Sequence, residues 1–297
     1  MPGEKILMSG LALGIVIFSA LLHASWNYLA KKSLNKIAFI WWAILFSTII
    51  FLPMFLYCWP TVSISFVGWA CIIATGVLHA FYFGFVGSAY QRGDLSLVYP
   101  LSRGSGPLFV PVLAVFILNE QLSMTGLYGI AFVILGIFII HLRSFAIHSF
   151  FEPFLALRDP ASLWALCTGG TIAGYSLVDK VGVAIVNPPV YIYLMFVISL
   201  LLLSPYVFIK MRSDLKKEWN INKIQILIVG FLDLFTYLMV LFALRISKVS
   251  YVAAAREVSI VFSALIGIIL LQEKNAPQKL VGAVLISLGV ILIGLSR

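Results

Sequence analysis

The fold is decided by a pair of short segments, YPLSR at residues 99–103 and VAAAR at residues 252–256, which each place an arginine about two turns inside an apolar run. Aligned on Arg103 and Arg256, the two regions share three more identities at the same spacing of 153 residues: Glu120 with Glu273, Gly129 with Gly282, and Gly136 with Gly289. A charge at bilayer depth costs roughly 2.5–3.5 kcal/mol even on a lenient insertion scale. Two such charges at matching positions predict an internal repeat whose halves build one central polar site.

The composition is that of a polytopic membrane protein. Of the 297 residues, 62% are hydrophobic and only 10% are charged, whereas about a quarter of the residues in soluble domains are charged. The first apolar stretch, at about residues 6–30, is long enough to span a bilayer and lacks a signal-peptide cleavage site, so we interpret it as the first span. The net charge of +9 comes mostly from short loops, which indicates membrane orientation rather than nucleic-acid binding.

Apolar runs near the length of a membrane-spanning helix recur along the whole chain. They lie at about residues 6–30, 37–58, 66–90, 95–118, 124–142, 162–181, 188–210, 222–244, 249–271 and 277–295. These runs predict an all-α integral membrane protein with ten transmembrane helices. Because each half crosses an odd number of times, we expect two inverted five-helix repeats, at residues 1–145 and 162–297, joined by a linker at 146–161.

Lys and Arg residues are distributed unevenly between alternate loops. One face carries Lys31, Lys32, Lys36, Arg92, Arg143, Arg158, Lys210, Arg212, Lys216, Lys217, Lys223, Lys274 and Lys279, and the other carries Lys5, Lys180, Arg245, Lys248 and Arg297. The positive-inside rule therefore places both termini outside the cytoplasm.

Motifs for catalysis, cofactors and metals are absent from the sequence. There is no GxSxG, HExxH, P-loop or Rossmann fingerprint, and the histidines show no ligand spacing. Cys58, Cys71 and Cys167 stand singly and are interpreted as packing residues. We therefore predict no enzyme activity, no cofactor and no metal. Without a nucleotide motif, transport is expected to use a gradient.

Polar and aromatic residues inside the spans fall on consistent helix faces. The predicted substrate-binding residues are Trp26, Asn27, His79, Tyr82, Tyr99, Arg103, Tyr175, Tyr237 and Arg256. For the aromatic residues and His79, the alternative is an interfacial anchor or a helix–helix hydrogen bond. Asp179 and Lys180 come late in their span, where an interfacial role and a functional role are equally compatible with the sequence.

Two acidic residues are candidates for proton coupling. Asp233 lies near the middle of its span, with no basic residue within two turns, and Glu257 follows Arg256 directly. Intramembrane carboxyl groups commonly act in proton relays, although Arg256 and Glu257 can also form a static pair. Pro107 and Pro111 interrupt the hydrogen-bond ladder of the fourth span, so we expect a kinked or locally opened helix that contributes to gating.

Several motifs resemble one known family. They are LHASWN at residues 22–27, GDLSLVYPLSRG at 93–104 and REVS at 256–259. In addition, each half has an acidic residue, Glu120 or Glu273, before a glycine-punctuated fifth helix. These features resemble the drug/metabolite transporter superfamily, in its ten-helix EamA-like branch, over nearly the whole chain.

The resemblance implies a permease with a central cavity between the halves, lined by the first four helices of each repeat. It also implies a bacterial inner membrane location, favours export, and favours cytoplasmic termini, in conflict with the loop charges. The residues and the resemblance together predict secondary transport of a small polar metabolite with an anionic group, such as an amino acid or related organic anion, by alternating access and with proton coupling as an option. The alternative is a flippase for a lipid-linked substrate or an accessory membrane subunit. A single protein chain is sufficient to form a transport pathway, and a dimer is also compatible with the sequence.

Overall fold

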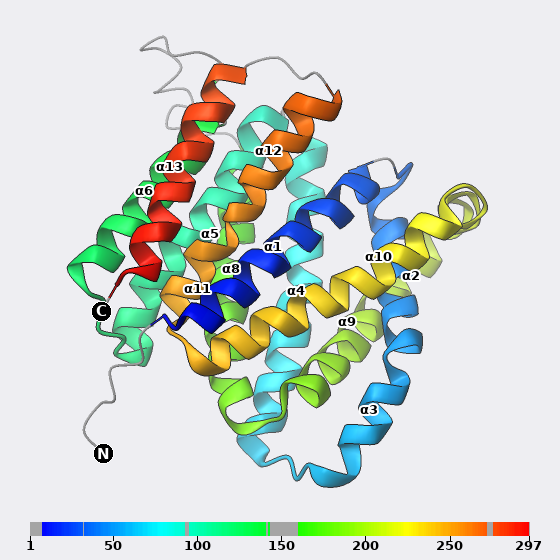
Figure 1. The fold of residues 1–297 in the computed structure, drawn as a ribbon. Coiled ribbons are helices and arrows are strands. Elements are labelled where there is room, and N and C mark those ends of the chain that lie inside the picture. The colour runs from blue at the N-terminus through cyan, green and yellow to red at the C-terminus, as the bar shows by residue number, and fades with distance from the viewer. Residues whose placement is uncertain are drawn as a thin grey trace.

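The computed structural model describes residues 8–31, 33–92, 95–140, 142, 160–271 and 276–296. Helices and their connections make up this part of the chain, without a strand (Figure 1). The elements in chain order are α1 (Gly10–Lys31), α2 (Lys36–Ile50), α3 (Leu52–Cys58), the 3-10 turn η1 (Trp59–Thr61), α4 (Phe66–Arg92), α5 (Leu95–Leu118), α6 (Met124–Ile140), α8 (Pro160–Ile185), α9 (Pro188–Lys210), α10 (Arg212–Ile246), α11 (Val249–Arg256), α12 (Val258–Leu271) and α13 (Ala276–Gly294). The predicted all-α class is confirmed.

The length and apolar character of the helices fit a membrane protein. Five of them in the described chain are long and apolar enough to cross a bilayer when α11 and α12 are taken together, and the pair formed by α2 and α3, bent by 45°, is a sixth candidate. Large apolar side chains also cover the outside of the molecule; Phe66 is 89% exposed and Phe116 is 79% exposed. Such a surface is stable in hydrocarbon rather than in water.

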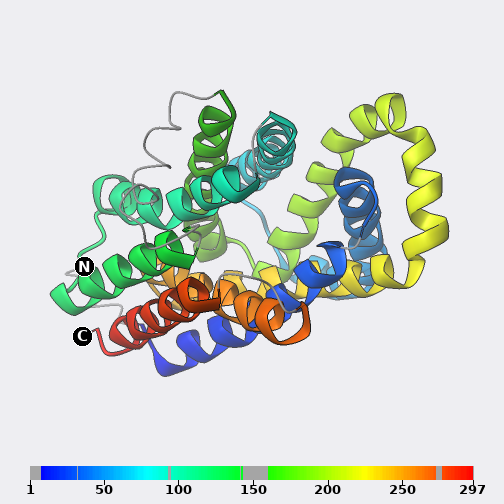
Figure 2. The ribbon, with the colours of Figure 1, turned by 90° about the horizontal axis from the view of Figure 1, so that it is seen from above.

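The helix α6 packs against α13 through glycines of the internal repeat (Figures 1 and 2). A Cβ atom on Gly129 would lie 2.7 Å from the carbonyl oxygen of Gly289, and one on Gly136 would lie 2.7 Å from that of Gly282. These contacts run in opposite chain directions, so the helices are antiparallel. The spacing of 153 residues converts one contact into the other, which is what a twofold relation between the repeats requires.

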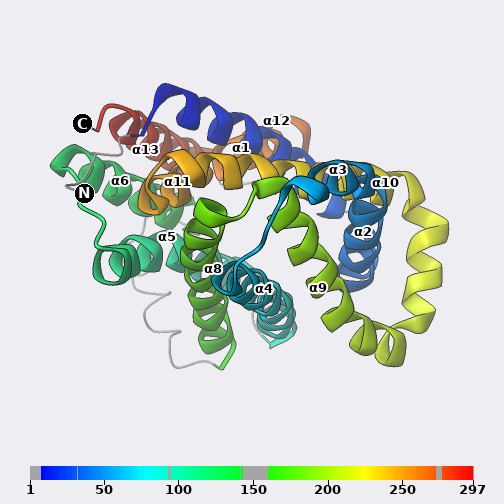
Figure 3. The same cartoon turned by 90° about the horizontal axis from the view of Figure 1, so that it is seen from below.

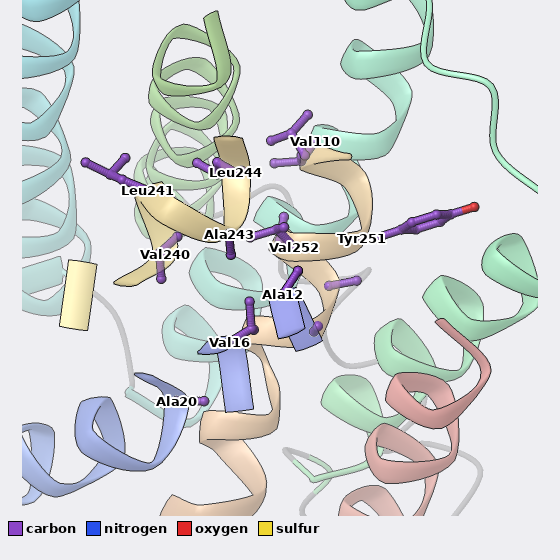
Figure 4. Close-up of a cluster of buried hydrophobic side chains, with 14 of the residues drawn as sticks. Ala12, Val16, Ala20, Val110, Val240, Leu241, Ala243, Leu244, Tyr251 and Val252 are labelled. Atoms are coloured by element: carbon purple, nitrogen blue, oxygen red, sulfur yellow. The ribbon is translucent and has the colours of Figure 1, made fainter. Parts of the chain in front are cut away.

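The main apolar cluster runs through most of the helices, and one part of it lies where α1, α5, α10 and α11 meet (Figure 4). Ala12 and Val16 of α1 lie on the side of α10 that carries Val240 and Ala243, and Val252 of α11 completes the contact. These side chains are 2% exposed or less. Small residues on α1 let the helices approach closely, as is usual where helices associate in membranes.

On the other side of the molecule, α8 lies between α4 and α5 (Figure 3). The contact between α5 and α8 is close, because a Cβ atom on Gly106 would lie 2.9 Å from Ile172 and one on Gly169 would lie 2.7 Å from the Cβ of Ser105. The same contact bears on the predicted kink or local opening of α5. The backbone of α5 stays helical through Pro107 and Pro111, so the predicted local opening is absent, and the packed wall of α8 supports the helix there. A bend in α5 stays a prediction.

The ninth apolar run is instead the one that breaks. Its two helices, α11 and α12, are separated by Glu257, whose backbone N–H bonds to the carbonyl of Ala254 at 3.1 Å, three residues back rather than four. No proline lies in this run. The sequence therefore predicted an interrupted helix in the first repeat, at Pro107 and Pro111. The structure instead has the irregular residue, Glu257, at the matching level of the second repeat.

Charged side chains fix the turn between α10 and α11. Lys180 donates to the carbonyl oxygens of Leu244 and Ser247, both at 2.6 Å. On the other side of the turn, Glu120 accepts from the N–H of Val249 at 2.7 Å and from the N–H and hydroxyl of Ser250 at 3.2 and 2.6 Å. The last carbonyls of α10 and the first N–H groups of α11 thus obtain partners that their own helices lack.

Candidate functional site

Arg256 occupies the last turn of α11, directly before the helix break. Its guanidinium lies 5.3 Å from the centre of the Tyr237 ring of α10, within the range of a cation–π contact. The fold therefore stabilises a positive charge inside the helix bundle.

The first cavity beside Arg256 has an empty volume of about 380 Å³. It lies between α1, α10 and the α11–α12 break. Its lining residues are Ser19, Ala20, His23, Asp233, Thr236, Tyr237, Val240, Arg256 and Ser259. The lining thus carries a carboxyl group from α10 and a guanidinium from α11, and the remaining polar groups are hydroxyls and an imidazole.

A second, smaller cavity also has Arg256 in its lining. Its walls come from α5, α8 and α11, and its lining residues are Gly106, Pro107, Ile172, Tyr175, Ser176, Ala253, Arg256 and Glu257. Arg256 lines both cavities. Arg256 is therefore shared by two spaces, one built with α1 and α10 and the other with α5 and α8.

Aromatic rings from three helices gather next to Arg256. The imidazole of His79 stacks on the ring of Tyr175, with centroids 4.2 Å apart, and meets Tyr237 edge-on at 5.4 Å. The rings of Tyr82 and Tyr175 lie 6.3 Å apart. The Nδ1 atom of His79 is 2.8 Å from the carbonyl oxygen of Thr75, which fixes the ring on its own helix. Five predicted residues, His79, Tyr82, Tyr175, Tyr237 and Arg256, are thus brought together.

The structure adds Asp179 to this group, a residue for which the sequence left both roles open. Its carboxylate is fully buried on α8. It accepts a hydrogen bond of 2.8 Å from the hydroxyl of Tyr191 of α9, and another from the hydroxyl of Tyr237 of α10. Asp179 therefore joins three helices and orients the Tyr237 ring that faces Arg256.

The two proton-coupling candidates lie in different cavities. Asp233 lines the first cavity and is only partly buried, and its carboxylate accepts no hydrogen bond from the described part of the chain. Glu257 is 7% exposed, lines the second cavity and forms the break between α11 and α12. Asp233 is therefore the carboxylate that an incoming group in the first cavity meets.

Trp26 and Asn27 are not among the residues that line these cavities. Trp26 packs on the cluster of Ala30, Phe39 and Ala43, between α1, α2 and α10. Asn27 is exposed and donates to the carbonyl of His23 on its own helix at 2.8 Å. Their role in substrate binding stays a prediction, because this conformation directs neither of them to Arg256.

The side chains of Tyr99 and Arg103 lie outside the described residues, although their backbone belongs to α5. Of the two predicted gating prolines, Pro107 lines the second cavity. Pro111 is buried on the same helix. Ser19 and Ser259 were not predicted and line the first cavity. Their signal in the sequence is weak, because a serine in a membrane helix commonly bonds to its own backbone or to a neighbouring helix.

Comparisons with known proteins agree with this architecture. The model of the EamA-like transporter family matches residues 9–142 and 159–295. A solved structure, titled only as the crystal structure of a protein, shares 14% sequence identity, with a TM-score of 0.74 over 96% of each chain, which shows a shared fold. Among curated proteins, no sequence matches. Both repeats fit the family, whose members are membrane transporters rather than enzymes, so the predicted resemblance is confirmed and the chain belongs to the EamA-like transporter family.

Proposed function

We propose that the protein is a secondary transporter that moves a small polar metabolite with an anionic group by alternating access. The observation that carries this proposal is the place of Arg256, which lines both cavities within apolar helices. A charge at this depth is costly and is typical of a substrate or ion pathway. A guanidinium binds carboxylate or phosphonate oxygens through fork-like donors.

The first cavity offers complementary groups for such a ligand. Asp233 can bind a substrate ammonium or exchange a proton, and the hydroxyls of Ser19, Thr236 and Ser259 can bond to further oxygens. Tyr237 supplies an apolar ring face beside the guanidinium.

We further propose ten membrane spans in two inverted repeats, in a bacterial inner membrane. The crosswise glycine contacts between α6 and α13 support the twofold relation. The hydroxyl of Ser247 lies 3.1 Å from the sulfur of Met8, and a Cβ on Gly294 would lie 2.7 Å from Leu13. Both ends of the described chain therefore lie at one end of the molecule, which supports an even number of crossings.

Binding and transport by the purified protein test this proposal. A thermal-shift screen against amino acids, phosphonates and sugar phosphates is expected to find a ligand, because binding to the folded state stabilises it by mass action. Arg256→Ala is expected to remove the shift, while Arg245→Ala, which removes an exposed charge at the end of α10, retains it. An undiminished shift in the Arg256 variant would refute the binding site.

Coupling is tested in vesicles loaded with the ligand found by that screen. Asp233→Asn is expected to abolish accumulation driven by a proton gradient but to retain substrate exchange, whereas Arg256→Ala loses both. If Asp233→Asn still accumulates substrate when only a proton gradient is supplied, Asp233 is not the coupling site and Glu257 is the next candidate. Loading vesicles of known orientation determines whether net flux is outward, as the family resemblance implies.

A further inference from the structure

The segment between α9 and the membrane-crossing part of α10 has a mixed charge in the sequence. Residues 210–223 contain five basic side chains, Lys210, Arg212, Lys216, Lys217 and Lys223, and the acids Asp214 and Glu218. On a solvated helix, acids and bases three or four residues apart would pair and compensate each other. In the structure they do not.

Folding separates the two signs of charge on this segment. Glu218 is fully buried and accepts hydrogen bonds from the backbone N–H groups of Leu34 and Asn35, at 3.1 and 2.9 Å. Asp214 accepts a bond of 2.8 Å from the side-chain amide of Asn35. Both acids are thus bound to the connection between α1 and α2. The five basic side chains are all exposed, and no described residue forms an ion pair with them.

Apolar contacts fix this orientation. Met211 and Leu215 pack with Trp41 in a buried cluster, and the indole N–H of Trp42 donates to the carbonyl of Leu215 at 3.0 Å. The ring of Trp219 stacks on another ring of α2, that of Phe46, with centroids 5.2 Å apart. The inner face of the segment is therefore held against α2, and the basic face cannot turn inward.

The length of α10 places the segment at the edge of the bilayer. Its 35 residues would extend about 52 Å if straight, whereas the hydrocarbon core is about 30 Å thick. The backbone leaves helical geometry at Asn222, with φ −116° and ψ 21°, and Figure 2 shows the yellow-green segment before it turned away from the rest of the helix. Residues 223–246 are long enough to cross the hydrocarbon core by themselves. Residues 212–221 are therefore left for the interface between the bilayer and water.

Exposed apolar residues flank the basic ones on both sides. Phe208 and Ile209 precede them, and Ile221 and Ile224 lie on either side of Lys223 in the sequence, each at least 52% exposed. Basic side chains next to lipid-facing apolar ones are typical of the boundary between headgroups and acyl chains. A free anion in water would make no favourable contact with these apolar side chains, whereas the acyl chains of a lipid would.

We propose that residues 210–223 form a binding site for the headgroups of anionic phospholipids in the surrounding bilayer. Arg212 offers a planar fork to phosphate oxygens, and the lysines act as mobile point charges on long apolar stems. The apolar flanks contact the acyl chains of the same lipids. This site is separate from the cavities at Arg256 and does not depend on the proposed transport function.

The experiment uses the delipidated full chain and native mass spectrometry. Phosphatidylglycerol and phosphatidylcholine with identical acyl chains are titrated, and the dissociation constant of each is measured. In the triple variant Arg212→Gln, Lys216→Gln, Lys217→Gln, the affinity for phosphatidylglycerol is expected to fall roughly fivefold for each charge removed, since a basic residue at an anionic surface contributes about 1 kcal/mol. The affinity for phosphatidylcholine is expected to stay unchanged.

Arg245→Gln is the matched control, because it removes an exposed positive charge from the other end of the same helix. The proposal is overturned if the triple variant binds phosphatidylglycerol like the wild type, if Arg245→Gln loses as much affinity as the single variant Lys217→Gln, or if both lipids bind the wild type equally. Full displacement of the lipid by millimolar glycerol phosphate would also overturn it, since a site for free phosphate needs no acyl-chain contact. If the triple variant does not fold, Lys217→Gln alone decides.

Discussion

Replacing Glu120 by Ala removes the three hydrogen bonds that this carboxylate makes with the first turn of α11. The N–H groups of Val249 and Ser250 then lose the acceptor that the described part of the chain gives them, in a partly buried place. Loss of a helix cap costs about 1 kcal/mol, and hydrogen bonds to a charged group contribute about 1.5–3 kcal/mol. Allowing for partial rescue by water, we expect a destabilisation of about 2–4 kcal/mol.

This change is measured as the thermal unfolding midpoint of the purified protein in detergent, where it corresponds to a decrease of roughly 5–10 °C. Gln121→Ala is the control, because this neighbour is exposed and uses only its backbone carbonyl, as acceptor for Lys248. Unfolding of Glu120→Ala within a degree of Gln121→Ala would refute the capping role. The acidic residue before the fifth helix of the first repeat would then require another explanation.

Gly289→Ala is expected to destabilise the protein by about 1–3 kcal/mol, because the added Cβ would lie 2.8 Å from Val133 and close to the α6 backbone. The control is Gly14→Ala, whose added Cβ would have no atom within 4 Å. This control is expected to keep the unfolding midpoint of the wild type. Asp179→Asn and Tyr237→Phe, combined in a double-mutant cycle of unfolding, are expected to show a coupling of about 1.5–3 kcal/mol, and additive effects would contradict the bond between them. Pro107→Ala restores a donor to the Arg103 carbonyl and is expected to slow turnover in vesicles more than it weakens binding, whereas unchanged turnover would contradict a gating role for the proline.

The sequence predicted the helical segments closely because the bilayer sets their length and demands apolar side chains. The repeat was also visible, since Gly129, Gly136 and their partners form a contact in which only glycine fits. Asp179 shows why the site was only partly predictable. It follows Tyr175 by four residues and so shares its helix face, but the residues that bond to it, Tyr191 and Tyr237, come from other helices. Such contacts have no signature in a single helix.

The two repeats differ in the backbone of their fourth span, at the level of Arg103 and Arg256. In α5, each proline deletes one backbone hydrogen bond, and the close approach of α8 at Gly106 keeps the helix intact. In the second repeat the helix is irregular at Glu257 without a proline, and Arg256 lies directly before this irregular residue. The helix is irregular beside the charged residues Arg256 and Glu257 although no proline predicts this. Such a conflict between local sequence and structure is characteristic of functional sites. Arg256 therefore lies at an irregular point of the second repeat, beside two cavities whose walls come from both repeats.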